Sequence, residues 1–342
     1  MMGLLAAGFV LAGVLLQARV GTAAEATPAR APVATTGLFA FFSDFETNLN
    51  DALIAAGLAR KDGKPEPFRA DPEASCFEKL AASRRAGWDA AVDYYAKIIS
   101  PGGWMSRPQF LIRMQLVGFD GEWQTTGAEF VEIAQSFRNA AAPAYRSCRW
   151  AAQDGKNRRW IAELEPALAA DERTAATRLE RLYQKRWRAL PMLVDVVETV
   201  DWSGANSSWS DFGQGDILVS SSTSSAAAFE TLWHEASHVL MDRGDPVRQA
   251  LEEAAKAAKF ELPKDLWHVV LFYGTGETVR RIRSERGQPD YTPMVYEIYA
   301  RGSWTEYREA LETQWLPYVE GKRTLQEAAT GLIAALQKPA AR

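Results

Sequence analysis

Residues that commonly bind metal ions through nitrogen or sulfur are scarce in this chain. Its 342 residues include only three histidines and two cysteines. The cysteines, Cys76 and Cys148, are far apart and lack zinc-site spacing, which excludes a Cys-rich zinc module. Any nitrogen-based metal chemistry therefore depends on very few side chains.

The chain also lacks a large excess of one charge. Beyond its first residues it lacks a long apolar run as well. The formal net charge is −4, so electrostatics favour neither a nucleic-acid partner nor an anionic membrane surface. Beyond residue 17 no stretch is both apolar and long enough to cross a bilayer, so we expect no stable membrane span in the mature chain.

The first residues resemble an export signal. Residues 3–17 form a short apolar run, and small residues follow it. This pattern predicts a signal peptide over residues 1–24 and an Ala/Pro/Thr-rich linker over residues 25–36. An uncleaved N-terminal anchor is the alternative. A signal peptide implies a secreted or periplasmic protein, where Cys76 and Cys148 are expected to form a disulfide.

Two of the three histidines stand in the motif His-Glu-x-x-His, formed by His234, Glu235 and His238. On a helix each residue advances about 100°, so histidines four residues apart can converge on one ion. Glu235 would then lie beside the metal and could accept a proton from its water. The uncharged flanks of the motif are typical of a helix buried beneath a cleft. The alternative is a partly buried helix with two surface histidines.

Helical patterns dominate the first half of the chain. Apolar residues recur at spacings of three and four from Phe39 to Leu53, and this spacing predicts an amphipathic helix. A second helix is expected over residues 76–99, and residues 110–116 fit a strand or a helix. Residues 128–190 read as helices broken near Asp154-Gly155 and Pro166. We therefore predict an N-terminal helical region over residues 37–190.

The residue composition of the chain changes after Pro191. Residues 192–202 and 215–220 are rich in β-branched and apolar residues, and a Gly/Asn/Ser stretch separates them. These segments predict a small antiparallel sheet that leads into the motif helix. The expected fold class is α+β and predominantly helical, with a catalytic region over residues 191–342.

A catalytic zinc ion usually has three protein ligands and one open position. The candidates for the third ligand are His268 and Glu277, and less strongly Glu252 and Glu253. His268 and Glu277 are nine residues apart, so on one straight helix they face opposite sides. The apolar neighbours of His268 are typical of core packing, which favours Glu277 as the ligand. A break at Gly274–Gly276 would let both line the site.

Further candidates could assist the chemistry. Either Tyr273 or His268 could stabilise the oxyanion that forms when water attacks a carbonyl. Asp242 could orient the His238 imidazole, although a surface aspartate near a helix end is the simpler interpretation.

The motif and a glutamate on a later helix resemble the gluzincin, thermolysin-like zinc metallopeptidases. Thr231, three residues before the first histidine, also fits this group. The resemblance covers roughly residues 192–285. It implies a zincin-like fold, a zinc ion bound by His234, His238 and Glu277, and an edge strand that binds extended substrate, for which residues 215–220 are similarly placed. The glutamate-helix motifs of thermolysin-like enzymes and aminopeptidases, and the third histidine of metzincins, are missing, so no subfamily is assigned.

These observations lead to one expected function and one alternative. The expected function is an exported zinc metallopeptidase, in which Glu235 assists the attack of zinc-activated water on a peptide or protein substrate. The alternative is a non-catalytic periplasmic protein that contains zinc and serves in binding or structure.

Overall fold

The computed structural model describes residues 30–69, 74–99, 103–120, 122–200, 204–210, 213–242 and 244–337. The expected signal peptide lies outside these residues. The chain from Ala31 to Arg342 forms one compact unit. Among the described residues, no helix combines the length and the apolar character that a bilayer crossing requires.

A five-stranded mixed sheet lies within this unit, and its strand order is β1-β2-β3-β5-β4. The central strands β2, β3 and β5 are parallel, whereas β1 and β4 run antiparallel to their neighbours at the two edges. The strands are β1 (Ala34–Thr35), β2 (Phe39–Phe42), β3 (Met192–Val197), β4 (Ala205–Trp209) and β5 (Gly215–Ser220). The α+β class is therefore confirmed, but the expected antiparallel sheet is wrong because its centre is parallel.

The N-terminal region contributes to this sheet. Residues 39–42, which were expected to begin a helix, form β2 and pair with β3. All four side chains of β2 are buried, and a strand buried on both faces needs no polar alternation. The end of the expected linker, Ala34–Thr35, pairs with β2 as well. The expected regions 37–190 and 191–342 thus share one sheet.

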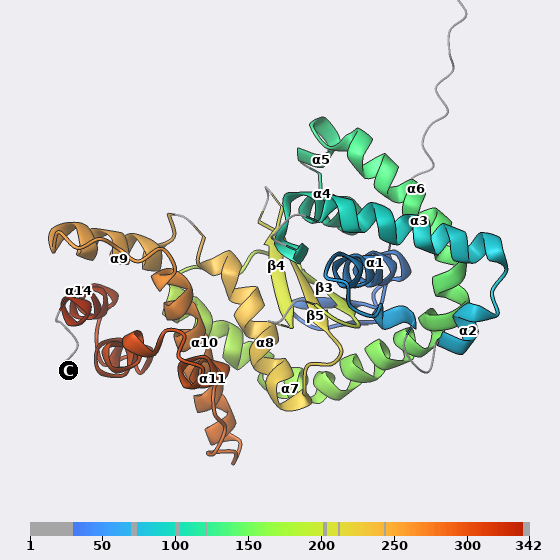
Figure 1. Ribbon diagram of the computed structural model, residues 1–342. Helices are drawn as coiled ribbons and strands as arrows, with labels where there is room; N and C mark the ends of the chain where they lie inside the picture. The colour runs from blue at the N-terminus through green and yellow to red at the C-terminus, as the bar shows by residue number, and fades with distance from the viewer. Residues whose placement is uncertain are drawn as a thin grey trace, which may run out of the picture. The chain divides into compact units, whose positions relative to one another are not determined.

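Helices cover both faces of the sheet. Alternate residues of β3 and β5, such as Val194 and Ile217, face a core that includes Trp233 of α8 (Ser225–Ser237). The intervening side chains face the N-terminal helices, and Asp216 of β5 forms a buried ion pair with Arg113 of α4. Figure 1 shows the sheet between α1 on one side and α8 on the other. The motif helix is therefore held against a rigid, fully packed sheet.

The helices of the N-terminal region form a second hydrophobic core. Helix α1 begins at Phe45, because the side chain of Asp44 accepts a hydrogen bond from the backbone N–H of Thr47. Residues 107–117 form a helix rather than a strand, and Gly118 ends it with φ = 77°. The elements are α1 (Phe45–Lys61), α2 (Ala74–Glu78), α3 (Ala82–Ile98), α4 (Arg107–Val117), α5 (Glu122–Thr125) and α6 (Ala128–Tyr145).

The longest helix contradicts the expected breaks. After α6 the chain passes through a π-helical turn, η3 (Arg146–Trp150), into α7 (Ala151–Tyr183), which is continuous across Gly155 and Pro166. Pro166 is exposed, whereas Ile161 and Leu164 are buried in the main core. Burial of the apolar face therefore outweighs the hydrogen bond that proline removes.

The expected disulfide is confirmed. Cys76 on α2 is bonded to Cys148 in η3, 72 residues later. In the chain-entropy model, closing a loop of this length stabilises the folded state by about 4 kcal/mol.

We expect the double variant Cys76→Ser/Cys148→Ser to lose about 4 kcal/mol of unfolding free energy. Urea denaturation of the variant and the oxidised wild type measures this difference. Identical unfolding midpoints for the two proteins would contradict the stabilising role of the bond.

The helices after the sheet are α9 (Pro246–Ala257), α10 (Leu266–Glu285), α11 (Met294–Ala300), α12 (Arg308–Ala310), α13 (Leu316–Val319) and α14 (Leu325–Leu336). Helix α10 packs on α8, on α7 and on α11. It is the element that brings residues from beyond position 250 to the motif helix.

Candidate metal centre

Helix α8 positions the first two histidines. It begins after Ser224, whose side chain accepts a hydrogen bond from the backbone N–H of Ala227. His234 lies in the last turn of α8, and His238 begins the 3-10 turn η4 (His238–Leu240). This end of the helix lies close to the start of β5, where a Cβ on Gly215 would contact Val239 at 3.3 Å. A Cβ there would clash first with the side chain of Met192 on β3, so Gly215 lets this strand, Met192 and Val239 of η4 pack closely.

His268, in the first turn of α10, completes a group of three histidines. One ring nitrogen from each of His234, His238 and His268 lies within 4.8 Å of the others. The three ring centroids are 5.1, 5.3 and 5.2 Å apart, so the imidazoles surround a common point almost symmetrically. The Nε2 atoms of His234 and His268 are 3.4 Å apart. Two imidazole nitrogens on one tetrahedral zinc ion would be roughly 3.3 Å apart.

The structure places Glu277, the favoured third ligand, elsewhere. Helix α10 is continuous through Gly274–Gly276, so Glu277 and His268 face different sides. The buried Glu277 carboxylate accepts hydrogen bonds from Arg280 at 2.7 Å and from Tyr296 at 3.4 Å. The group that could hold a metal ion therefore contains the alternative, His268, and not Glu277. Glu252 and Glu253 on α9 are also outside the histidine group.

Tyr273 shares the side of α10 that carries Glu277. Four residues separate the two, and burial among Glu277, Tyr296 and Glu312 raises the pKa of the Tyr273 phenol. The expected oxyanion role of Tyr273 thus has no support from its position. His268, the other expected donor, belongs to the histidine group itself. Asp242 lies in the turn after η4, where its backbone N–H donates to Asp245.

The Glu235 carboxylate adjoins the histidine group. Its Oε1 lies 4.0 Å from Nε2 of His234, and its Oε2 lies 3.9 Å from Nε2 of His238. The side chain is buried. A carboxylate at this distance from the histidine nitrogens is close enough to contact a water on an ion that they hold.

Burial keeps the three imidazoles neutral. It lowers the pKa of His234 well below the ordinary value, lowers the pKa of His238 to about 3 and lowers the pKa of His268 to about 4. The neighbouring imidazoles lower the pKa of His234 and of His238 further, whereas Asp265 raises that of His268. A neutral imidazole retains the lone pair that binds a metal ion.

Aromatic rings surround the histidines, and sequence reasoning did not assign any of them to the site. Phe272 lies 3.7 Å from the His234 ring, centroid to centroid, and Trp267 lies 5.1 Å from that of His268. Trp304 contacts His268 at 5.6 Å from a left-handed backbone conformation with φ = 57°. Its indole N–H donates to Asp265 at 2.6 Å. Phe272 was placed on the same side of the helix as His268, four residues later, but was interpreted as core packing.

The three-histidine group can hold a metal ion. Three neutral imidazoles beside a carboxylate fit an ion that has three nitrogen ligands and keeps a fourth position open. Comparisons with protein-family models, curated proteins and solved structures give no match for this chain.

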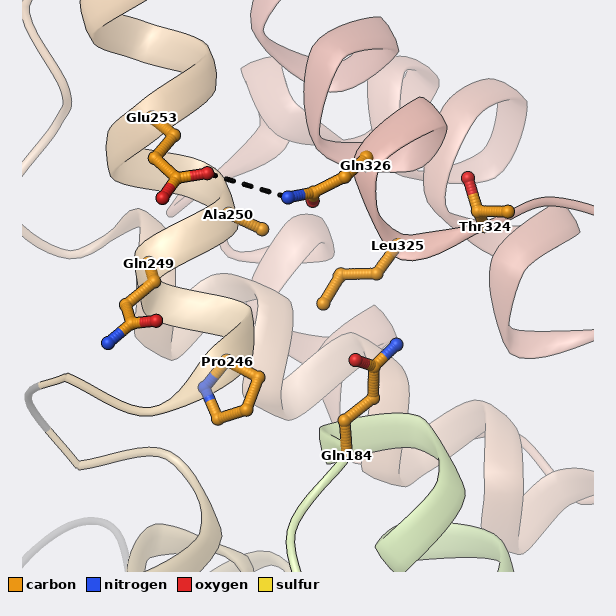
Figure 2. A pocket seen from close by; sticks show the side chains of 8 residues that line it. All are labelled: Gln184, Pro246, Gln249, Ala250, Glu253, Thr324, Leu325 and Gln326. Atoms are coloured by element: carbon orange, nitrogen blue, oxygen red, sulfur yellow. Dashed lines mark hydrogen bonds between the residues drawn. The ribbon is translucent and has the colours of Figure 1, made fainter.

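A surface pocket of about 320 Å³ lies apart from the histidines, between α9 and α14 (Figure 2). Gln249 and Glu253 of α9 face Leu325 and Gln326 of α14 across it, and Glu253 accepts a hydrogen bond from Gln326 at 3.5 Å. None of the three histidines lines this pocket.

Glu230, one helical turn before His234, gives a testable dependence of stability on pH. Burial raises its pKa to about 7, although its carboxylate accepts hydrogen bonds from Tyr291 Oη and the backbone N–H of Met294. Between about pH 4.5 and 7 the folded protein therefore holds a proton that the unfolded chain has released. This contribution to stability is present at low pH and is lost as the pH rises through 7.

We expect Glu230→Gln to remove the decrease in unfolding free energy that wild type shows as the pH rises from about 4.5 to 7. For one proton this decrease approaches about 1.4 kcal/mol per pH unit. The measurement compares unfolding free energies of variant and wild type from pH 4.5 to 8. The comparison isolates Glu230, because the histidines give an opposite slope in both proteins. A constant difference between the two proteins at every pH would contradict the expectation.

Proposed function

We propose that this protein is an exported zinc-dependent metallopeptidase that hydrolyses peptide bonds. The observation that carries the proposal is the Glu235 carboxylate, which lies about as far from Nε2 of His234 as from Nε2 of His238, beside three converging imidazoles. A structural zinc site usually has four protein ligands and no such carboxylate.

Each residue of the histidine group and Glu235 has a defined role in the proposed hydrolysis. His234, His238 and His268 would hold the zinc ion, which when bound supplies a Lewis acid and lowers the pKa of water toward neutrality. Glu235 accepts the proton of the attacking water and then donates it to the leaving amine. Low-dielectric aromatic surroundings strengthen each electrostatic interaction in the site.

A peptide-cleavage assay with the mature protein tests the proposal. The zinc-loaded protein is incubated with a mixed peptide library, and products are identified by mass spectrometry. We expect cleavage that stops with a chelator such as 1,10-phenanthroline and returns when zinc is added. Bound zinc without cleavage of any peptide would instead favour a non-catalytic protein that uses zinc for binding or structure.

A further inference from the structure

Arg248 lies beside the histidine group and takes no part in the chemistry described so far. It stands in the first turn of α9, and its guanidinium carbon is 4.4 Å from the centre of the Trp267 ring. The Trp267 ring in turn lies 5.1 Å from that of His268 and 5.7 Å from that of His238. One indole ring therefore separates the guanidinium from two of the three imidazoles.

The charge of Arg248 is not neutralised within the described part of the chain. Its Nη1 makes a long hydrogen bond, 3.4 Å, to the backbone carbonyl of Met241, and no described carboxylate forms an ion pair with it. A cation in the first turn of a helix also opposes the helix macrodipole. The stability of α9 thus does not explain an arginine here.

The chemistry of a stacked guanidinium points to its ligand. Stacking on an indole uses the face of the guanidinium and leaves its N–H edge available. That edge matches a carboxylate, which it binds through two parallel hydrogen bonds. Arg248 is also half-buried, where a charged hydrogen bond is screened less than on an open surface.

We propose that Arg248 binds a substrate carboxylate close to the scissile bond; this inference rests on the proposed peptidase function. An extended peptide advances roughly 3.4 Å per residue. A peptide segment of about two or three residues therefore reaches from a scissile bond at the histidine group past the Trp267 ring to Arg248. The carboxylate can be the free C-terminus of a short peptide or an acidic side chain. In the first case the enzyme removes short C-terminal fragments.

Peptide pairs that differ only at one carboxylate test the assignment. One series compares C-terminal acids with the matching amides, and a second places a glutamate or a glutamine two or three residues from the scissile bond in amidated peptides. We expect the wild type to prefer one carboxylate form by about 10- to 100-fold in kcat/KM. The series that shows the preference identifies the source of the carboxylate.

The variant Arg248→Met keeps the aliphatic stem on Trp267 and removes the charge. We expect it to abolish the preference, mainly through KM, whereas Arg248→Lys retains a part of it because the charge remains. Arg186→Met, at an exposed arginine after α7, serves as the control and keeps the preference. Equal kcat/KM for all pairs in the wild type, or an unchanged preference in Arg248→Met, would overturn the proposal.

A binding measurement separates this inference from the peptidase proposal. Calorimetry on the zinc-loaded protein compares a hydroxamate-capped dipeptide that has a free C-terminal carboxylate with the matching C-terminal amide. We expect the acid to bind at least 10-fold more tightly to the wild type but not to Arg248→Met. This result with no peptide cleavage would reject the peptidase and keep the carboxylate site. Equal affinities in the wild type would reject the carboxylate site whatever the peptides show.

Discussion

Replacing His268 by alanine is expected to lower zinc affinity by orders of magnitude. The variant leaves His234 and His238, which form only part of the group of three converging nitrogens. A catalytic zinc site normally needs three protein ligands, so the loss of one should release the metal under mild chelation. Competition with a fluorescent zinc chelator measures the affinity of variant and wild type.

Glu277→Gln is the matched control for this experiment. Glu277 lies on the same helix and is buried, but its carboxylate binds Arg280 and Tyr296. We expect this variant to keep its zinc affinity, although breaking a buried ion pair lowers stability. Loss of zinc from Glu277→Gln, with retention by His268→Ala, would return the ligand role to Glu277.

The second large effect is expected for Glu235→Gln. Glutamine has nearly the same shape as glutamate but cannot accept the proton of the attacking water. We expect peptide hydrolysis to fall roughly 10²- to 10⁴-fold, the usual contribution of a general base. The zinc content should stay at the wild-type value, because Glu235 is not among the three candidate ligands. Initial rates on one cleaved peptide, together with metal analysis, give both quantities.

Glu230→Gln provides the corresponding control on the same helix. Glu230 is as deeply buried as any carboxylate of α8, but it binds Tyr291 and Met294 rather than adjoining the histidine nitrogens. Its replacement should change the pH dependence of stability and leave the hydrolytic rate within a few-fold. Equal losses of activity in both variants would assign the effect of Glu235→Gln to altered packing of α8.

Local patterns in the sequence predicted the parts of the site that lie within one helix. The spacing of His234 and His238 requires only helical geometry, and the structure keeps both histidines near one ion position. The two cysteines and the expected signal peptide similarly predicted the disulfide between Cys76 and Cys148. In each case a short-range rule or a very small number of candidates was sufficient.

The third histidine depended on tertiary packing. The apolar neighbours of His268 were interpreted as core residues, yet Phe272 and Trp267 contact the rings of the histidine group in the structure. Periodicity alone cannot distinguish an apolar face that packs in a core from one that encloses a site. The contact between Trp304 and His268 could not be predicted from the sequence either. The two residues are 36 positions apart, and Trp304 is placed by a left-handed backbone turn.

The sheet was misread for a related reason. Strand β2 carries Phe39, Phe41 and Phe42 within a longer series of apolar residues at helical spacing, and burial on both faces removes the alternation that marks a strand. Its parallel pairing with β3 joins residues about 150 positions apart. The edge beside β5 is therefore formed by β4, and residues 215–220 are an inner strand rather than the expected edge strand.

X-ray absorption spectroscopy of the zinc-loaded protein identifies the ligands of the metal ion. With a three-histidine site we expect one zinc ion per chain with three imidazole nitrogens at about 2.0–2.1 Å and one additional light-atom ligand from water. The imidazole scattering should drop to two rings in His268→Ala and stay at three in Glu277→Gln. A wild-type spectrum with two imidazoles and a carboxylate, or a protein that binds no zinc, would contradict a zinc site formed by His234, His238 and His268.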